Sequence, residues 1–329
     1  MRTVTVGLIT YNRKDLLKRA VKSVIRQKYN KFQLLIGNDF EKEKITFKKL
    51  GIKKDPRIKI FNHKKNLGER NNMNFLLNKA NTKWFTWLAD DDYLHRNYLQ
   101  RLVVSINKNK NKNVVACYSN YSRVDLLKKI PKKKELTMRK SEFLNKFTKK
   151  EARLVGVFGL LKTNYLKKIK GIHKTGKSFL INKKKVHIYP YCDPLVPIML
   201  SKYGNIIWID EKLYHLNTKN NSISVRTSDY NIYKSAESYV LFQLKNTLKK
   251  NVNNINKKKI LKNLIDWFLW NRLNLIKKRN PFLNLILIFY YYFDFFVLLR
   301  NKHYNSNILS ILNYKVKLFT FIIKSFYRE

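Results

Sequence analysis

The chain has 329 residues, of which 44% are hydrophobic, and Lys and Arg outnumber Asp and Glu by 70 to 21. This apolar content is enough for one large core or two smaller domains, so the composition excludes a wholly disordered chain. The formal net charge of +49 predicts an anionic partner, namely nucleic acid, acidic lipid headgroups or phosphorylated small molecules, although codon bias in an AT-rich genome explains the lysine excess equally well.

The cysteine content and the first residues bear on the cellular compartment. Cys117 and Cys192 are far apart and form no CxxC pair, which argues against a disulfide framework and against a cysteine zinc site. Residues 1–15 pass straight into a strand pattern and lack the long apolar region of a signal peptide. We therefore expect a cytoplasmic protein.

The first hundred residues predict strands that alternate with helices. Apolar, β-branched or aromatic runs predict strands over 3–10, 32–39, 58–63 and 84–89. Residues 16–25 have apolar side chains at helical spacing after Asn12, a candidate N-cap, and a second helix is expected after Gly68. This alternation predicts an α/β fold, Rossmann-like, with a mainly parallel sheet flanked by helices.

Polar residues follow three of the predicted strands. Thr10, Asp39 and the acids at 90–92 each lie at or just past a strand end. Ligands bind beyond the carboxyl ends of the strands in such sheets, so we expect these residues to form one crevice.

The rest of the chain is expected to form an acceptor half and a C-terminal extension. Residues 106–229 continue the pattern of 1–105 within one domain, whereas 230–329 are helical, basic and aromatic. Residues 281–299 approach the ~20 residues that cross a bilayer, but Asn284 and Asp294 interrupt them. An amphipathic helix lying on the membrane is favoured, with a buried bundle helix and a spanning helix left open.

The three consecutive carboxylates Asp90, Asp91 and Asp92 repel one another unless a cation or several donors neutralise them. Hard divalent ions prefer oxygen ligands, and Mg²⁺ is typically held by one or two carboxylates together with substrate phosphates. A solvated turn is the alternative for such a triplet, but this one ends a hydrophobic strand in an acid-poor chain. The triplet therefore favours a site for Mn²⁺ or Mg²⁺ and a nucleotide diphosphate.

Three segments carry a resemblance to a known family. ITYNRKDLLKRAVKSVIRQKYNKFQLLIGND, NLGERNNMN and LADDDYL resemble the nucleotide-facing segments and the DxD region of an inverting family 2 glycosyltransferase of the GT-A fold, of the bacterial surface-polysaccharide type. The resemblance is specific up to about residue 102, weaker over 154–224 and absent from the C-terminal hundred residues.

This resemblance implies roles for single residues of the donor site. Thr10, Tyr11 and Asp39 match positions that line the base and ribose pocket, where Asp39 accepts a hydrogen bond from a uracil or thymine imide. Asn66 and Arg70 match the segment that closes over the nucleotide. Asp90 matches a position facing the ribose or the donor sugar, and Asp91 or Asp92 the direct metal ligand.

The resemblance also implies a catalytic base and a further ligand. Asp193, which opens a predicted helix before Pro194, matches the acid that deprotonates the acceptor, and an N-cap role is compatible with this. His215 is a candidate third metal ligand, although it comes earlier than the family's Arg and His. Asn38 and Cys192 replace residues that the family usually has as acids or glycine.

The leading expectation is a metal-dependent glycosyltransferase that moves a sugar from a UDP- or dTDP-sugar to a glycan or lipid-linked acceptor by a single inverting displacement. Its basic, aromatic extension would hold it peripherally at the acidic inner face of the cell membrane. The alternative is a non-catalytic basic protein on a degenerate transferase fold that binds membrane or nucleic acid. No nucleic-acid-binding motif supports that alternative, so no nucleic-acid partner is expected.

Overall fold

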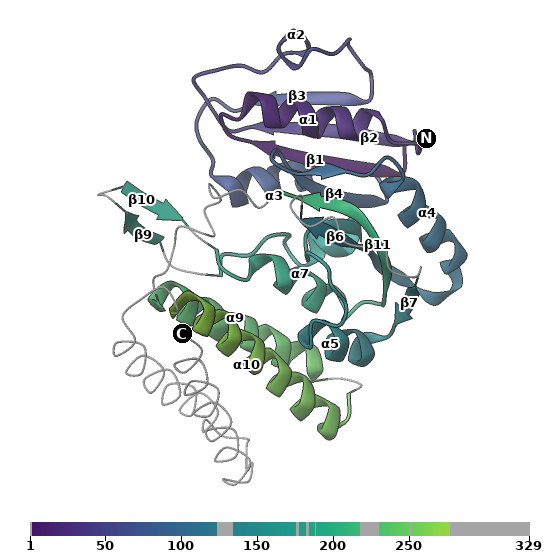
Figure 1. Cartoon of the computed structure of the whole chain (residues 1–329), viewed down its shortest axis with the longest axis vertical. Helices are drawn as coiled ribbons and strands as arrows, with labels where there is room; N and C mark the ends of the chain where they lie inside the picture. The colour runs from purple at the N-terminus through teal and green to yellow at the C-terminus, as the bar shows by residue number, and fades with distance from the viewer. Residues whose placement is uncertain are drawn as a thin grey trace, which may run out of the picture. The chain divides into compact units, whose positions relative to one another are not determined.

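The structure is a computed structural model that describes residues 2–123, 134–175, 178–181, 184–187, 189–217, 230–249 and 252–276 (Figure 1). The chain divides into two units between Trp270 and Asn271, and the description below concerns the first.

The strands are β1 (Val4–Thr10), β2 (Phe32–Asn38), β3 (Ile58–Asn62), β4 (Trp84–Ala89), β5 (Tyr93–Leu94), β6 (Val114–Arg123), β7 (Glu135–Met138), β8 (Gly159–Lys162), β9 (Ser178–Ile181), β10 (Lys184–His187) and β11 (Asn205–Leu216). The helices are α1 (Lys14–Ile25), α2 (Phe47–Leu50), α3 (Glu69–Lys79), α4 (Tyr98–Lys108), α5 (Lys140–Thr148), α6 (Thr163–Lys168), α7 (Cys192–Leu200), α9 (Tyr230–Leu248) and α10 (Asn254–Ile276), with a 3₁₀ turn at Lys110–Lys112.

One large sheet runs in the order β3-β2-β1-β4-β8-β6-β11-β5, and β7 adds to β11. The strands from β3 to β4 are all parallel, and β6 is parallel to β11. The short strands β5, β7 and β8 pair antiparallel with their neighbours. The predicted α/β fold with a mainly parallel sheet is thus confirmed, with mixed pairing in the acceptor half.

Helices cover both faces of the parallel part of the sheet. The even residues of β1, namely Val4, Val6 and Leu8, are fully buried in a core that includes the apolar stripe of α1. Gly7 points to the opposite face, where an added Cβ would contact Leu76 of α3 and Phe85. The lack of a side chain at Gly7 therefore leaves room for the Phe85 ring, which an added Cβ would approach to 2.6 Å.

The N-terminus of α1 differs from the prediction. The N-cap is Arg13, and Asn12 precedes it in the left-handed region with φ 51°. The predicted N-cap at Asn12 is therefore wrong, because the left-handed turn delays the first helical residue to Lys14.

The C-terminal helices pack behind the acceptor half. Helix α9 lies beside α7 (Figure 1), and Glu237 of α9 accepts a hydrogen bond from the Tyr191 hydroxyl at 3.1 Å. Asn263 of α10 donates to Asn145 of α5 at 3.2 Å. The domain boundary expected after residue 229 stays a prediction, and the compact unit itself continues through α9.

Within the residues that the structure describes, no helix is long and apolar enough to span a bilayer. The segment 281–299, expected to lie on the membrane, falls outside the described residues.

Candidate active site

The predicted convergence of strand ends is confirmed. Thr10 at the end of β1 is paired in register with Asn38 at the end of β2, and Ile9 with Ala89 at the end of β4. The Asp39 amide donates to the Thr10 carbonyl at 3.0 Å. The residues after these three parallel strands therefore meet at one edge of the sheet.

Asp90 is held rigidly at this edge. Its Oδ2 accepts hydrogen bonds from Thr10 Oγ1 at 2.7 Å and from the Tyr11 amide at 3.3 Å. Burial raises the pKa of Asp90, while the hydrogen bond from Thr10 and the charge of Arg13 oppose that rise. The Thr10 hydroxyl thus helps to hold the Asp90 carboxylate in place.

Asp91 is the most accessible of the three acids. About 22% of its side chain is exposed, and its Oδ2 accepts a hydrogen bond from Arg13 Nη1 at 2.8 Å. The same Arg13 atom lies 3.3 Å from Asp90 Oδ1. Arg19 donates to the main-chain carbonyl of Asp91 and so helps to hold the backbone there.

Asp92 is turned away from the other two carboxylates. Its Oδ2 accepts a hydrogen bond from the buried Tyr214 hydroxyl at 2.8 Å, and its Oδ1 one from the Asn217 amide at 2.8 Å. Burial raises the pKa of Asp92 to about 7, and its two hydrogen bonds limit that rise. Asp92 thereby joins the turn after β4 to the end of β11.

Asp39 lies where β2 meets the segment before α3. Its two carboxylate oxygens accept hydrogen bonds from the amides of Leu67 at 2.6 Å and Gly68 at 2.8 Å. Asn66 Oδ1 accepts a second bond from the Gly68 amide at 2.7 Å. Burial raises the pKa of Asp39, and the two backbone amides counteract it.

Tyr11 is half exposed and packs edge-to-face against Phe40, with ring centroids 5.4 Å apart. An exposed aromatic ring beside a buried carboxylate can stack on a flat base while the acid selects its edge. The residues predicted for a base pocket, Thr10, Tyr11, Asp39 and Asn66, are thus neighbours around the ends of β1 and β2.

Arg70 lies against the acceptor half. Its Nε donates to the Ile172 carbonyl at 3.0 Å, its Nη1 donates to Asn71 Oδ1 at 2.8 Å, and its guanidinium lies 5.8 Å from the Tyr189 ring centroid. Arg70 therefore ties α3 to the loop after α6.

Asp193 lies in the first turn of α7, whose N-cap is Tyr191 with φ 59°. The N-cap role named for Asp193 is wrong, because the helix begins at Cys192, two residues before Pro194. Loss of hydration raises the pKa of Asp193 to about 6, and the charge of Glu69 adds to the rise. Behind Asp193, an added Cβ at Gly156 would overlap the Asp193 carbonyl oxygen, so only glycine fits there.

Glu69 is coupled electrostatically to Asp90 and Asp91 after β4 and to Asp193 on α7. Glu69 lies in the first turn of α3, where its side chain is exposed. Loss of hydration raises the pKa of Glu69, and the charges of Asp91 and Asp90 raise it further. The charge of Glu69 also raises the pKa of Asp193 on α7.

His215 lies at the end of β11, paired with Tyr93 of β5. It stacks on Tyr93 with centroids 4.5 Å apart, and its Nδ1 lies 2.6 Å from Ser122 Oγ. Successive residues of a strand point to opposite faces, and the preceding residue, Tyr214, is the one that reaches Asp92. The role of His215 as a third metal ligand stays a prediction.

The donor atoms fit a divalent ion that is shared with a substrate. In the described part of the chain, no group of three or more His, Cys, Asp or Glu side chains surrounds a common position. Asp91 offers a hard, partly exposed carboxylate beside Asp90, and Mg²⁺ is typically held by one or two carboxylates with phosphate oxygens completing the shell. An all-protein metal cage is not formed by these residues.

Sequence reasoning missed Arg13, Glu69 and Tyr214 as residues of this site. Arg13 lies in the segment ITYNRKD and Glu69 in NLGERNNMN, two of the segments that resemble nucleotide-facing parts of the family. Their charges within these segments could have marked them as residues of the site. Tyr214 gave no such signal, because its contact with Asp92 spans 122 residues of sequence.

Comparisons with known proteins agree with this geometry. An uncharacterized glycosyltransferase of Rickettsia bellii is 27% identical over 122 residues, which are 37% of this chain and 17% of the relative. GalNAc(5)-diNAcBac-PP-undecaprenol beta-1,3-glucosyltransferase of Campylobacter jejuni is 30% identical over 110 residues, 33% of this chain and 36% of that protein. The matches thus cover well under two thirds of these relatives.

Solved structures share the fold. S. aureus TarS 1-349 in complex with UDP superposes with a TM-score of 0.57 at 14% identity, over 80% of this chain and 70% of that chain. The mannosyltransferase PcManGT from Pyrobaculum calidifontis, in complex with GDP-Man and Mn²⁺, gives a TM-score of 0.53 at 12% identity, over 88% and 79%. The predicted GT-A fold is confirmed.

The family model described as Glycosyl transferase family 2 matches residues 5–170, which contain β1 to β8 and every strand end of the crevice. The chain therefore belongs to glycosyl transferase family 2.

Proposed function

We propose that this protein is a metal-dependent, inverting glycosyltransferase that uses a UDP- or dTDP-sugar. The observation that carries the proposal is the meeting of the ends of β1, β2 and β4, which brings Thr10, Asp39 and the partly exposed Asp91 to one edge of the sheet. We place Asp193 on the acceptor side of that edge. An inverting displacement needs charge stabilisation for the leaving diphosphate and a base for the acceptor hydroxyl. We assign the first role to Asp91 with its divalent ion and the second to Asp193.

Asp91 would be the direct protein ligand of Mn²⁺ or Mg²⁺, and Asp90 would face the ribose or the donor sugar. Asp92 is better suited to positioning, because both of its oxygens accept hydrogen bonds from β11 and the residue after it. The divalent ion, when bound, would neutralise the departing diphosphate. Its ligand set would combine Asp91 with phosphate oxygens.

Asp193 would act as the general base. A base works best when its pKa lies near the working pH, and the pKa of about 6 places Asp193 in that range while leaving it ionised at pH 7. Tyr11 and Asp39 would bind the base of the nucleotide, Asn66 would hold the turn above it, and Arg70 would keep α3 against the acceptor loop.

A lipid-linked acceptor at the membrane is the acceptor class that we propose. A relative in Campylobacter jejuni is named for transfer to a diphosphoundecaprenol-linked glycan, and the net charge of +49 favours an acidic, diphosphate-bearing surface. Peripheral association with the inner face of the membrane follows from the same charge.

Calorimetric titration tests the donor site. The purified protein is titrated with UDP, dTDP and GDP, each with Mn²⁺ and with EDTA, and the titrations are repeated on Asp91→Ala. Asp15→Ala is the matched control, because Asp15 is a highly exposed acid on α1. We expect UDP or dTDP to bind only with Mn²⁺, and Asp91→Ala to lose that binding while Asp15→Ala keeps it. Metal-independent binding, or no binding of any nucleotide, would instead favour the non-catalytic alternative.

A further inference from the structure

Arg13 is the positive charge that lies directly on the acids after β4. Its Nη1 donates to Asp91 Oδ2 at 2.8 Å and to Asp90 Oδ1 at 3.3 Å. The Arg13 side chain is 35% exposed, whereas those of Asp90 and Asp91 are 7% and 22% exposed. The guanidinium thus covers the two carboxylates from the solvent side.

The place of Arg13 on its helix makes this arrangement unusual. Arg13 is the N-cap of α1, a position where side chains normally accept a hydrogen bond from the first turn, and an arginine has no acceptor to offer. A cation is also disfavoured at the positive end of a helix dipole. The contact with Asp90 and Asp91 offsets both disadvantages.

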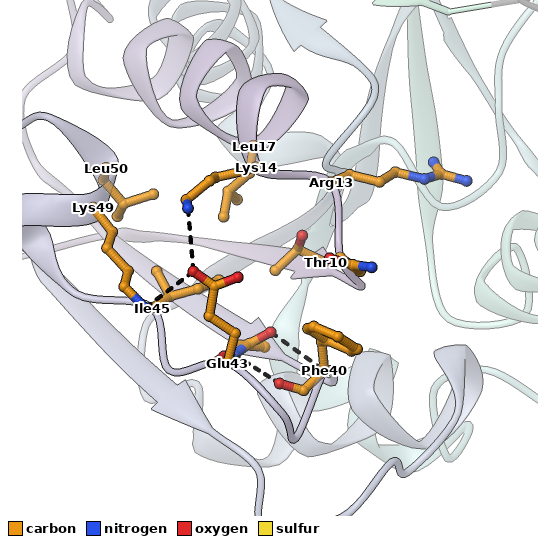
Figure 2. Close-up of a pocket in the computed structure, with 11 residues that line it drawn as sticks. Thr10, Arg13, Lys14, Leu17, Phe40, Glu43, Ile45, Lys49 and Leu50 are labelled. Atoms are coloured by element: carbon orange, nitrogen blue, oxygen red, sulfur yellow. Dashed lines mark hydrogen bonds and ion pairs between the residues drawn. The ribbon is translucent and has the colours of Figure 1, made fainter.

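The neighbouring lysine does not share this role. Lys14 lies 3.2 Å from Glu43, which Lys49 also contacts at 3.0 Å. Figure 2 shows both lysines pointing toward Glu43, while the Arg13 side chain extends away from them. Two adjacent cations on one helix end therefore serve separate acids.

We propose that Arg13 is a built-in counter-cation of the donor site, which competes with the divalent ion for Asp90 and Asp91 and moves onto the diphosphate when the nucleotide binds. This inference rests on the proposed function. The acids cannot offer the same oxygens fully to a guanidinium and to a metal ion, so metal binding alone displaces Arg13 from its partners. A diphosphate supplies Arg13 with a new anionic partner, because a guanidinium fork matches phosphate oxygens.

The consequence is a coupling between the two ligands. Without nucleotide, Arg13 weakens metal binding, and with nucleotide it no longer does so. By thermodynamic linkage, the metal must then raise nucleotide affinity by the same factor. Removal of the guanidinium should strengthen binding of the metal alone and reduce the coupling.

The test measures Mn²⁺ affinity by electron paramagnetic resonance of the free ion, with and without UDP. The proteins are the full chain, Arg13→Gln, Arg13→Lys and the control Lys14→Gln, which removes the same charge one residue away. We expect Arg13→Gln to bind Mn²⁺ alone about tenfold more tightly, because a dication no longer faces a guanidinium a few ångströms away. Arg13→Lys should restore most of the competition, and Lys14→Gln should stay within about twofold, as an exposed and more distant charge does.

The effect of UDP separates this inference from the proposed function. In the unaltered protein UDP should tighten Mn²⁺ binding, and in Arg13→Gln the gain should be about tenfold smaller. The inference is overturned if Arg13→Gln binds Mn²⁺ alone no more tightly than the unaltered protein, or if Lys14→Gln gains as much Mn²⁺ affinity as Arg13→Gln. In either case, tighter Mn²⁺ binding with UDP still supports the donor site. An unaltered protein whose Mn²⁺ affinity ignores UDP overturns the proposed function. Circular dichroism with thermal unfolding confirms that each variant is folded.

Discussion

The replacement Asp193→Asn should make the protein more stable and inactive at the same time. Burial raises the pKa of Asp193 from 3.8 to about 6, so the folded state holds a proton on this group more tightly than the unfolded state does. The ionised carboxylate is therefore unfavourable in the folded protein above pH 6, and this disadvantage disappears as the pH falls toward 4. A pKa difference of about two between the folded and unfolded states corresponds to about 3 kcal/mol.

Urea unfolding at pH 5 and pH 8 measures the effect. The asparagine side chain of the variant is neutral at both pH values, so we expect the variant to gain up to about 3 kcal/mol at pH 8 and about half of that at pH 5. Asp15→Asn, with a side chain 93% exposed, should show no such pH dependence. If Asp193 is the general base, as we propose, its loss should lower transfer by about 10²- to 10⁴-fold while the affinity for UDP with Mn²⁺ stays within about twofold.

The pH difference decides the outcome. If Asp193→Asn is destabilised equally at pH 5 and pH 8, the carboxylate is not an unfavourable buried charge but a required hydrogen-bond acceptor. If transfer persists at the unaltered rate, Asp193 is not the base.

Three further replacements test the supports of the site. Gly156→Ala should lower turnover about a hundredfold, because the new Cβ would overlap the Asp193 carbonyl oxygen and displace the backbone of Asp193. Unchanged steady-state kinetics would refute this close packing. Tyr191→Phe removes the hydrogen bond to buried Glu237 and should lower the free energy of unfolding in urea by about 1–2 kcal/mol. It should also lower kcat while the KM for the donor stays constant. A change in KM alone would contradict this. Asp92→Ala should cost about 2–4 kcal/mol, with or without Mn²⁺, because it removes the acceptor of one buried and one partly buried hydrogen bond. Unaltered stability would show that Asp92 is not a positioning residue.

The sequence predicted the features that depend on local pattern and on sheet topology. Parallel strands place their carboxyl ends together, so the meeting of Thr10, Asp39 and Asp90 could be expected before any distance was known. The apolar spacing of α1 was equally visible, and the helix buries Leu17, Ala20, Val21 and Val24.

The missed features depend on details that the local sequence does not contain. The left-handed residue Asn12 moved the helix start by one position and turned Arg13 toward acids that are 77 and 78 residues away. Along β11, register shifts lie between Ile209 and Lys212 and between Lys212 and Tyr214, and they change which side chains point to each face of the sheet. A bulge exchanges the two faces of a strand, so the sequence alone could not predict the hydrogen bond from Tyr214 to Asp92.

The central claim is that Asp91 and Asp193 serve one transfer reaction in one crevice. The most direct test is the release of UDP from UDP-sugars in the presence of an undecaprenyl-diphosphate-linked glycan acceptor and Mn²⁺, compared between the unaltered protein and Asp193→Asn. We predict UDP release that requires both Mn²⁺ and acceptor, and its loss in Asp193→Asn with UDP binding retained. Equal release by the two proteins, or release that does not depend on Mn²⁺, would contradict the claim.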